Sequence, residues 1–248
     1  MSLCCSVLLI GCLSQLGFAT PTTRRILASD SLERAAKGAQ GDTEIQYCGK
    51  DQKAPIYTTG DPEVGPGFWI TNNDGVKGDY FIYENSRDNH PWKYITIDNG
   101  ARSFIQICST FQGHVVRGTT ATNLDNKVHN LSTWAVANVD AAGAVWGAIS
   151  FLEGSDGGGS VRATDGTQQR RECVADVLDG APAAALAPKG SGAMVLNKVV
   201  GEGASVDAMH WMLAKCSADQ VYMEEPGPNP VIKSDNGRLE FIFSQGRF

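Results

Sequence analysis

The sequence lacks the local motifs by which most enzymes and metal proteins are recognised. Its four histidines are scattered without the H-x-x-H spacing of a metal site, and no cysteine pair has the C-x-x-C spacing of zinc or redox sites. It contains no G-x-S-x-G nucleophile elbow, and no strand and helix frame the glycine run at 157–159 as they frame a phosphate-binding loop. These absences predict no metal and no cofactor, and they favour a protein that is not an enzyme.

Charged side chains are missing from the first nineteen residues, MSLCCSVLLIGCLSQLGFA. Their apolar run is followed by Gly17 and Ala19, the small residues that a signal peptidase accepts. The run is also too short to anchor the chain in a bilayer. We therefore expect a signal peptide over residues 1–19, cleavage after Ala19, and a secreted, extracellular protein without membrane contact once the signal is removed.

Aromatic side chains are missing from residues 20–43, a polar stretch that contains the dibasic pair Arg24-Arg25. A short helix over 31–37, capped by Asp30, fits its pattern. The stretch is either a pro-segment cut after Arg25 or a flexible N-terminal extension. Residues 44–248 then form a single domain.

Basic clusters are missing as well. The chain has 21 Lys and Arg against 27 Asp and Glu, a formal net charge of -6. This balance argues against nucleic acid and anionic membrane surfaces as partners, because both are bound through groups of positive side chains. A cationic or neutral ligand is more compatible with it.

Cysteine is sparse after the predicted signal peptide, where only Cys48, Cys108, Cys173 and Cys216 remain. An even number in an exported protein predicts two disulfides, for which three connectivities exist. Cys173 and Cys216 bracket an Ala- and Pro-containing stretch that breaks the surrounding pattern, so we favour a bond between them. Cys48 is then left to pair with Cys108.

Short apolar or alternating runs that end in turn residues fill the rest of the chain. They predict a mainly β fold, an antiparallel β-sandwich with a small helical or loop excursion around residues 173–216. Within the excursion, 205–216 fits either a helix capped by Ser205 or a strand. The expected strands are 68–71, 79–84, 92–97, 102–108, 114–117, 133–139, 144–152, 160–163, 231–234 and 238–243.

The last two expected strands flank Asn236-Gly237, the strongest short signal for a β-hairpin. We therefore predict that 238–243 pairs antiparallel with 231–234. The apolar face of the final strand would then bury Leu239, Phe241 and Phe243.

Candidate catalytic residues are the carboxylates Glu153 and Asp156, which directly follow an apolar strand. Two carboxylates at a suitable separation can hydrolyse a glycosidic bond, although loop acids are more often solvated turn residues. Trp92, Tyr83 and Tyr94 are candidates for stacking on sugar rings if they are exposed rather than part of the core.

Asn130 begins an Asn-Leu-Ser sequon, an acceptor for N-glycosylation in an exported chain unless it is left unused.

The segment 131–154, LSTWAVANVDAAGAVWGAISFLEG, resembles the core hairpin of thaumatin-like proteins through Trp146, Ile149, Ser150 and Gly154. The resemblance implies a secreted β-sandwich that can bind sugars. The chain departs from the family, which has many disulfides and has an aspartate where this chain has Ala148. The acidic cleft glutamate of the family also falls near Thr133 or Trp134, so its β-glucan cleft is not carried over.

The sequence thus predicts a secreted cell-wall or host-interaction protein that binds glycans without efficient hydrolysis. Its partner would be a cell-wall polysaccharide. The alternatives are a secreted, β-glucanase-like glycoside hydrolase and an effector-type protein that binds a host protein. An exposed strip of aromatic side chains would favour glycan binding. Two carboxylates that face each other across a cleft would favour the hydrolase, and a large exposed apolar patch would favour a protein partner.

Overall fold

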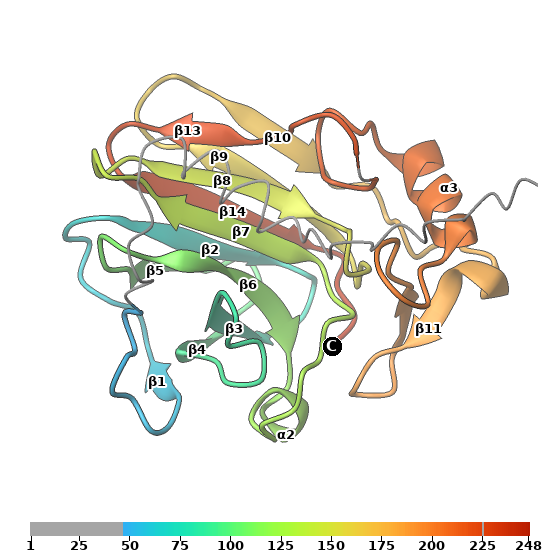
Figure 1. The fold of residues 1–248 in the computed structure, drawn as a ribbon, viewed down its shortest axis with the longest axis horizontal. Coiled ribbons are helices and arrows are strands. Elements are labelled where there is room, and N and C mark those ends of the chain that lie inside the picture. The colour runs from blue at the N-terminus through green and yellow to red at the C-terminus, as the bar shows by residue number, and fades with distance from the viewer. Residues whose placement is uncertain (1–46, 225) are drawn as a thin grey trace, which may run out of the picture.

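Two β-sheets packed face to face form a mainly β sandwich (Figure 1). The computed structural model of the protein describes residues 47–224 and 226–248. The predicted signal peptide, both predicted cleavage sites and the predicted helix over 31–37 lie outside the described residues. Within those residues, no helix has the length and apolar character needed to cross a membrane.

The larger sheet has seven strands in the order β1-β4-β3-β6-β7-β8-β13. In that order the strands are Ile56–Thr58, Lys93–Ile97, Gly78–Glu84, Gln112–Gly118, Trp134–Val139, Val145–Ser150 and Ile232–Ser234.

The smaller sheet has five strands in the order β10-β9-β14-β2-β5. These are Arg170–Cys173, Gly158–Ala163, Arg238–Ser244, Gly67–Asn73 and Arg102–Gln106. The predicted strands therefore match strands of the sandwich within a few residues, whereas β1 and β10 were not predicted.

The core lies between the two sheets, where alternate side chains of each strand meet. On β14, Leu239, Phe241 and Phe243 are fully buried, as the alternation predicts. Gly147 of β8 lies opposite them, and a Cβ atom there would lie 2.4 Å from the Leu239 side chain. The absent side chain thus allows the sheets to approach at this point.

The hairpin predicted at Asn236-Gly237 is wrong, although the turn is present. Gly237 has a φ of 75°, and its N–H donates to the carbonyl of Ser234 at 3.2 Å. The turn carries the chain from one sheet to the other. Strand β13 pairs with β8, whereas β14 lies between β9 and β2. A turn residue fixes the reversal of the chain, but the packing of the layers decides which strands pair.

The expectation of a purely antiparallel sandwich also needs correction. Strand β14 pairs with β2 in parallel over seven residues, and β1 pairs with β4 in parallel. The other strand pairs of the described residues are antiparallel. Strand β14 comes from the far end of the chain and enters the sheet between β9, its antiparallel neighbour, and β2, its parallel neighbour.

The predicted excursion lies at one end of the strands, at the right of Figure 1. It contains the 3-10 helix η1 (Ala183–Ala185), a two-stranded sheet of β11 (Leu186–Pro188) and β12 (Met194–Leu196), and α3 (Val206–Lys215). The alternative between helix and strand is settled as a helix, which Ser205 caps by accepting a bond from the Ala208 N–H at 3.1 Å. The other helix, α2 (Thr120–Asn123), lies elsewhere, after β6.

Two disulfides join Cys48 to Cys108 and Cys173 to Cys216, which is the predicted pairing. The second bond ties the end of α3 to the end of β10 and so holds the excursion against the sandwich. The first bond holds the beginning of the described chain near β5. Both bonds restrict the unfolded chain and thereby stabilise the fold.

Candidate functional site: an arginine-lined hollow

The outward side chains of the five-stranded sheet form rows that run across its strands. One row joins Arg170 of β10, Arg162 of β9, Glu240 of β14, Trp69 of β2 and Phe104 of β5 through successive register pairs. Arg102 lies opposite Thr71 in the next row. Because side chains alternate along a strand, every member of the first row points away from the core. Residues more than 100 positions apart in the sequence thus meet on one surface.

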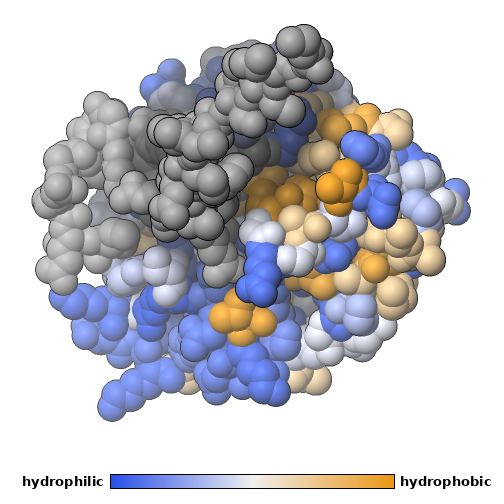
Figure 2. All heavy atoms as spheres, turned by 45° about the vertical axis from the view of Figure 1, so that its right-hand side comes forward, coloured by the Kyte–Doolittle hydropathy of each residue, from blue (hydrophilic) through white to orange (hydrophobic). Residues whose placement is uncertain are grey.

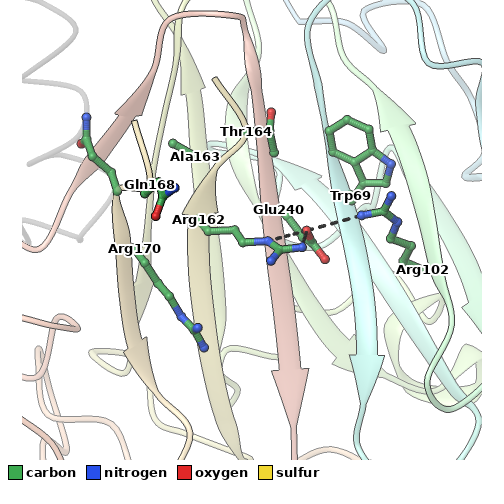
Figure 3. Close-up of a pocket in the computed structure, with 9 residues that line it drawn as sticks. Trp69, Arg102, Arg162, Ala163, Thr164, Gln168, Arg170 and Glu240 are labelled. Atoms are coloured by element: carbon green, nitrogen blue, oxygen red, sulfur yellow. Dashed lines mark hydrogen bonds and ion pairs between the residues drawn. The ribbon is translucent and has the colours of Figure 1, made fainter. Parts of the chain in front are cut away.

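A hollow of about 490 Å³ lies over this row. Figure 3 shows Arg170 and Gln168 on its β10 side, Trp69 and Arg102 on the opposite side, and Arg162 with Glu240 between them. The remaining lining residues are Ala163, Thr164 and Gln169. Guanidinium, amide and hydroxyl groups around an aromatic ring are the kind of polar and apolar lining that small-molecule and sugar sites use.

Glu240 is the carboxylate at the floor of the hollow, and it is only 3% exposed. It accepts bonds from the Arg162 Nε at 2.7 Å and from the Thr71 hydroxyl at 2.6 Å, and the Arg102 Nη1 lies 3.6 Å away. A buried carboxylate needs such partners, because removal from water penalises an isolated charge. Glu240 therefore fixes Arg162 and draws Arg102 toward the same point.

Trp69 forms the apolar wall of the hollow, but its ring is largely covered. Its centroid lies 4.8 Å from that of Phe104, and the guanidinium carbons of Arg102 and Arg238 lie 5.4 and 6.0 Å from it. Only 8% of the residue is exposed. The arginines therefore stack on the tryptophan, and they form the accessible surface.

The two predicted catalytic carboxylates are not part of this hollow. Glu153 is 4% exposed, and Asp156 is fully buried. Asp156 faces the Arg117 Nη1 at 2.6 Å and the Lys189 Nζ at 2.8 Å, and it accepts a bond from the Ser132 hydroxyl at 2.6 Å. Both acids lie in the loop after β8, as the sequence predicted, but they are buried and a substrate cannot reach them.

The charge of Asp156 is fixed by its surroundings. Burial alone would raise its pKa, but the positive charges of Lys189 and Arg117, with bonds from Lys189 and Ser132, lower the pKa to about 2. A carboxyl group that stays ionised and inaccessible cannot donate a proton to a leaving group. Asp156 is therefore a structural anion that links the sheets to the Lys189 loop.

The predicted sugar-stacking aromatics also lie away from the hollow. Tyr83 is 3% exposed and stacks on His114 at 5.3 Å, so its faces are not available. Tyr94 is half-buried and stacks on Phe81 at 5.6 Å. The structure thus places Tyr83 and Tyr94 on the outer face of the other sheet.

Trp92 is half-buried against the core near Phe111, with the Lys93 Nζ 4.3 Å from the centroid of its ring. Trp92 therefore does not present an exposed ring for stacking on a sugar. Asn130 is also half-buried, and its carbonyl accepts a bond from the Trp134 indole N–H at 3.0 Å. N-glycosylation at Asn130 remains a prediction.

The residues of the hollow were missed in the sequence because they come from five strands and the connection between β9 and β10. Only one local signal existed, since the alternation over 238–243 places Arg238 and Glu240 opposite the apolar face. Which strands flank β14, and so which arginines face Glu240, depends on sheet order. Across residues 47–224 and 226–248, no group of three or more His, Cys, Asp and Glu side chains is arranged to hold a metal ion.

No family model matches the sequence, and no curated protein matches it. Among solved structures, the chain is similar to the thaumatin-like xylanase inhibitor TLXI, with a TM-score of 0.42 and 9% sequence identity over 71% of this chain and 97% of the inhibitor chain. At this identity and TM-score, the similarity transfers no ligand and no residue role to this protein.

Proposed function

We propose that this is a secreted glycan-binding protein without efficient hydrolytic activity, and that the hollow on the five-stranded sheet is its binding site. The observation that carries the proposal is the lining itself, in which arginine, glutamine and threonine side chains share one hollow with Trp69. Such side chains can bond sugar hydroxyls while the hollow stays rigid on its strands. Export is supported by the apolar N-terminal run and by the two disulfides, which persist in oxidising compartments.

Binding is favoured over hydrolysis because the two candidate acids do not face a common cleft. A glycosidase needs two carboxyl groups that reach the scissile bond from opposite sides. Asp156 is enclosed by Arg117, Lys189 and Ser132, and Glu153 is buried as well. In the hollow, Glu240 is held by Arg162 and Thr71.

The test is retention of the protein on a panel of insoluble polysaccharides, with release of reducing sugar measured in the same samples. We expect retention on at least one polysaccharide without sugar release. Gln169→Ala, in the hollow, should weaken retention several-fold, whereas the matched Gln220→Ala, in the turn after α3, should not change it.

Two results would contradict the proposal. Retention on no polysaccharide would remove the glycan ligand. Sugar release that Glu153→Gln abolishes would replace the proposal with a glycoside hydrolase.

A protein partner is the second candidate, because hydrophobic side chains reach the surface at one end of the molecule (Figure 2). Val174, Met194 and Val206 of the excursion are each more than two-fifths exposed. Exposed apolar surface of this kind can mark a protein interface. Capture of a host protein that Val206→Asp prevents, together with failure to bind any polysaccharide, would favour this candidate.

A further inference from the structure

We infer that the glycan bound in the hollow is acidic, and that Arg170, Arg162 and Arg102 bind its carboxylate or sulfate groups. This inference rests on the proposed function, because it names the class of ligand that the same hollow takes. It reverses the expectation, drawn from the net charge, that the ligand is cationic or neutral. The chain as a whole is negative, but the sheet gathers positive side chains on one face.

The lining of the hollow has an excess of positive charge. Three guanidinium groups line it against the single carboxylate of Glu240. Glu172, two positions further along β10, forms an ion pair with Arg170, so some of the excess is balanced there. Arg102 and Arg170 remain about half exposed, at 54% and 50% of their side chains. Both can therefore turn toward a ligand without leaving a buried carboxylate alone.

Arg170 and Arg162 stand directly opposite each other on antiparallel strands. Opposed side chains on such strands have Cβ atoms about 5 Å apart, and like charges at these positions destabilise the sheet. Glu240 binds the Nε and Nη2 of Arg162, which leaves further N–H groups of that guanidinium available. An anion placed between the two arginines would relieve their repulsion.

The geometry of guanidinium groups suits planar or trigonal oxyanions. Two N–H groups of one arginine can bond the two oxygens of a carboxylate in parallel, and sulfate oxygens can be held in the same way. The neighbouring Gln168, Gln169 and Thr164 supply neutral donors and acceptors for hydroxyl groups. A sugar that carries both an acid group and hydroxyls uses the whole lining, whereas a neutral sugar leaves the arginines without partners.

The test compares polygalacturonate with its fully methyl-esterified form, which has the same backbone but no charge. We expect retention on immobilised polygalacturonate, at least tenfold weaker retention on the ester, and release of the bound protein by salt. Dextran sulfate and dextran repeat the comparison for sulfate. Retention on dextran sulfate alone would support the inference and identify sulfate as the group recognised.

Two variants of opposite sign test the site. Arg170→Gln should weaken retention on polygalacturonate about tenfold, because it removes one guanidinium and leaves Glu172 unbalanced. Glu172→Gln should strengthen retention, because it releases Arg170 to the ligand. Lys127→Gln is the matched control, since it removes one positive charge from an exposed position beyond α2 and should change nothing.

Retention that is equal on polygalacturonate and its ester, together with equal retention on dextran sulfate and dextran, would overturn the inference; binding to any polysaccharide would leave the proposed function standing. Arg170→Gln and Glu172→Gln variants that fold normally and bind unchanged would also overturn the inference. Failure to bind any charged or neutral polysaccharide would overturn both together.

Discussion

Arginine has opposite roles between the two sheets and on the outer face of the five-stranded sheet. Between the sheets, Arg117 of β6 is fully buried, and its Nε donates to Asp74 at 2.9 Å and its Nη1 to Asp156 at 2.6 Å. Its Nη2 donates to the carbonyls of Gly158 and Ser244, and its guanidinium lies 4.7 Å from the centroid of the Phe243 ring. On the outer side, the arginines are half exposed and outnumber the carboxylates. A guanidinium whose partners are complete stabilises the fold, whereas one that keeps available donors can bind a ligand.

Replacement of the buried arginine should have the largest effect. Arg117→Met leaves Asp74 and Asp156 buried without this partner, and breaking such an ion pair costs about 3–5 kcal/mol of the free energy of unfolding. Chemical denaturation measures the loss. On the outer face, Arg170→Met should change the same quantity by less than about 1 kcal/mol, because exposed ion pairs contribute little. Similar losses for the two variants would end the distinction between the two positions.

The two faces of one strand provide the second test. Phe241→Ala removes a fully buried ring from between the sheets and should lower the free energy of unfolding by about 3–5 kcal/mol. Ile242→Ala, the next position along β14, points outward and is half-buried, so its loss should be near 1 kcal/mol. Denaturation midpoints of the two variants give the comparison. A loss below about 1 kcal/mol for Phe241→Ala would mean that the register of β14 is wrong.

His114 sharpens the comparison, because it is a buried base stacked between Tyr83 and Trp134 at centroid distances of 5.3 and 3.7 Å. Burial lowers its pKa from 6.5 to about 3. Between about pH 3 and pH 6.5, His114 is protonated in the unfolded chain but neutral in the folded chain. The stability contributed by neutral His114 is therefore complete above pH 6.5. Below pH 6.5 it decreases by about 1.4 kcal/mol for each pH unit.

Unfolding free energies measured from pH 5 to 6.5 test this effect. His114→Phe keeps a ring in the stack and should flatten the profile, whereas the exposed control His210→Gln should not. The contribution of Asp156 to stability changes at lower pH. Its pKa is lowered from 3.8 to about 2, so its stabilisation is present above pH 3.8 and is lost as the pH falls through 2. An unchanged slope in His114→Phe would exclude His114 as the source.

Local pattern predicted most of the strands, because alternation of apolar and polar residues is a property of neighbouring positions. It gave Leu239, Phe241 and Phe243 as a buried face, and the bracketing cysteines gave both disulfides. It failed at the turn after β13, where a correct turn was assigned to the wrong pair of strands. It also failed at Asp156, because nothing near that residue in the sequence indicates that Arg117 and Lys189 enclose it.

By itself the sequence determined the β class, the buried face of the final strand, the excursion between Cys173 and Cys216, and the absence of local catalytic motifs. Each of these follows from neighbouring residues or from spacing along the chain. The order of the strands, the parallel neighbours of β14 and the arginine-lined hollow were decided only by the tertiary structure. Arg102, Arg162, Arg170 and Glu240 meet because two sheets must bury their apolar faces against each other, and that packing fixes which strands lie side by side.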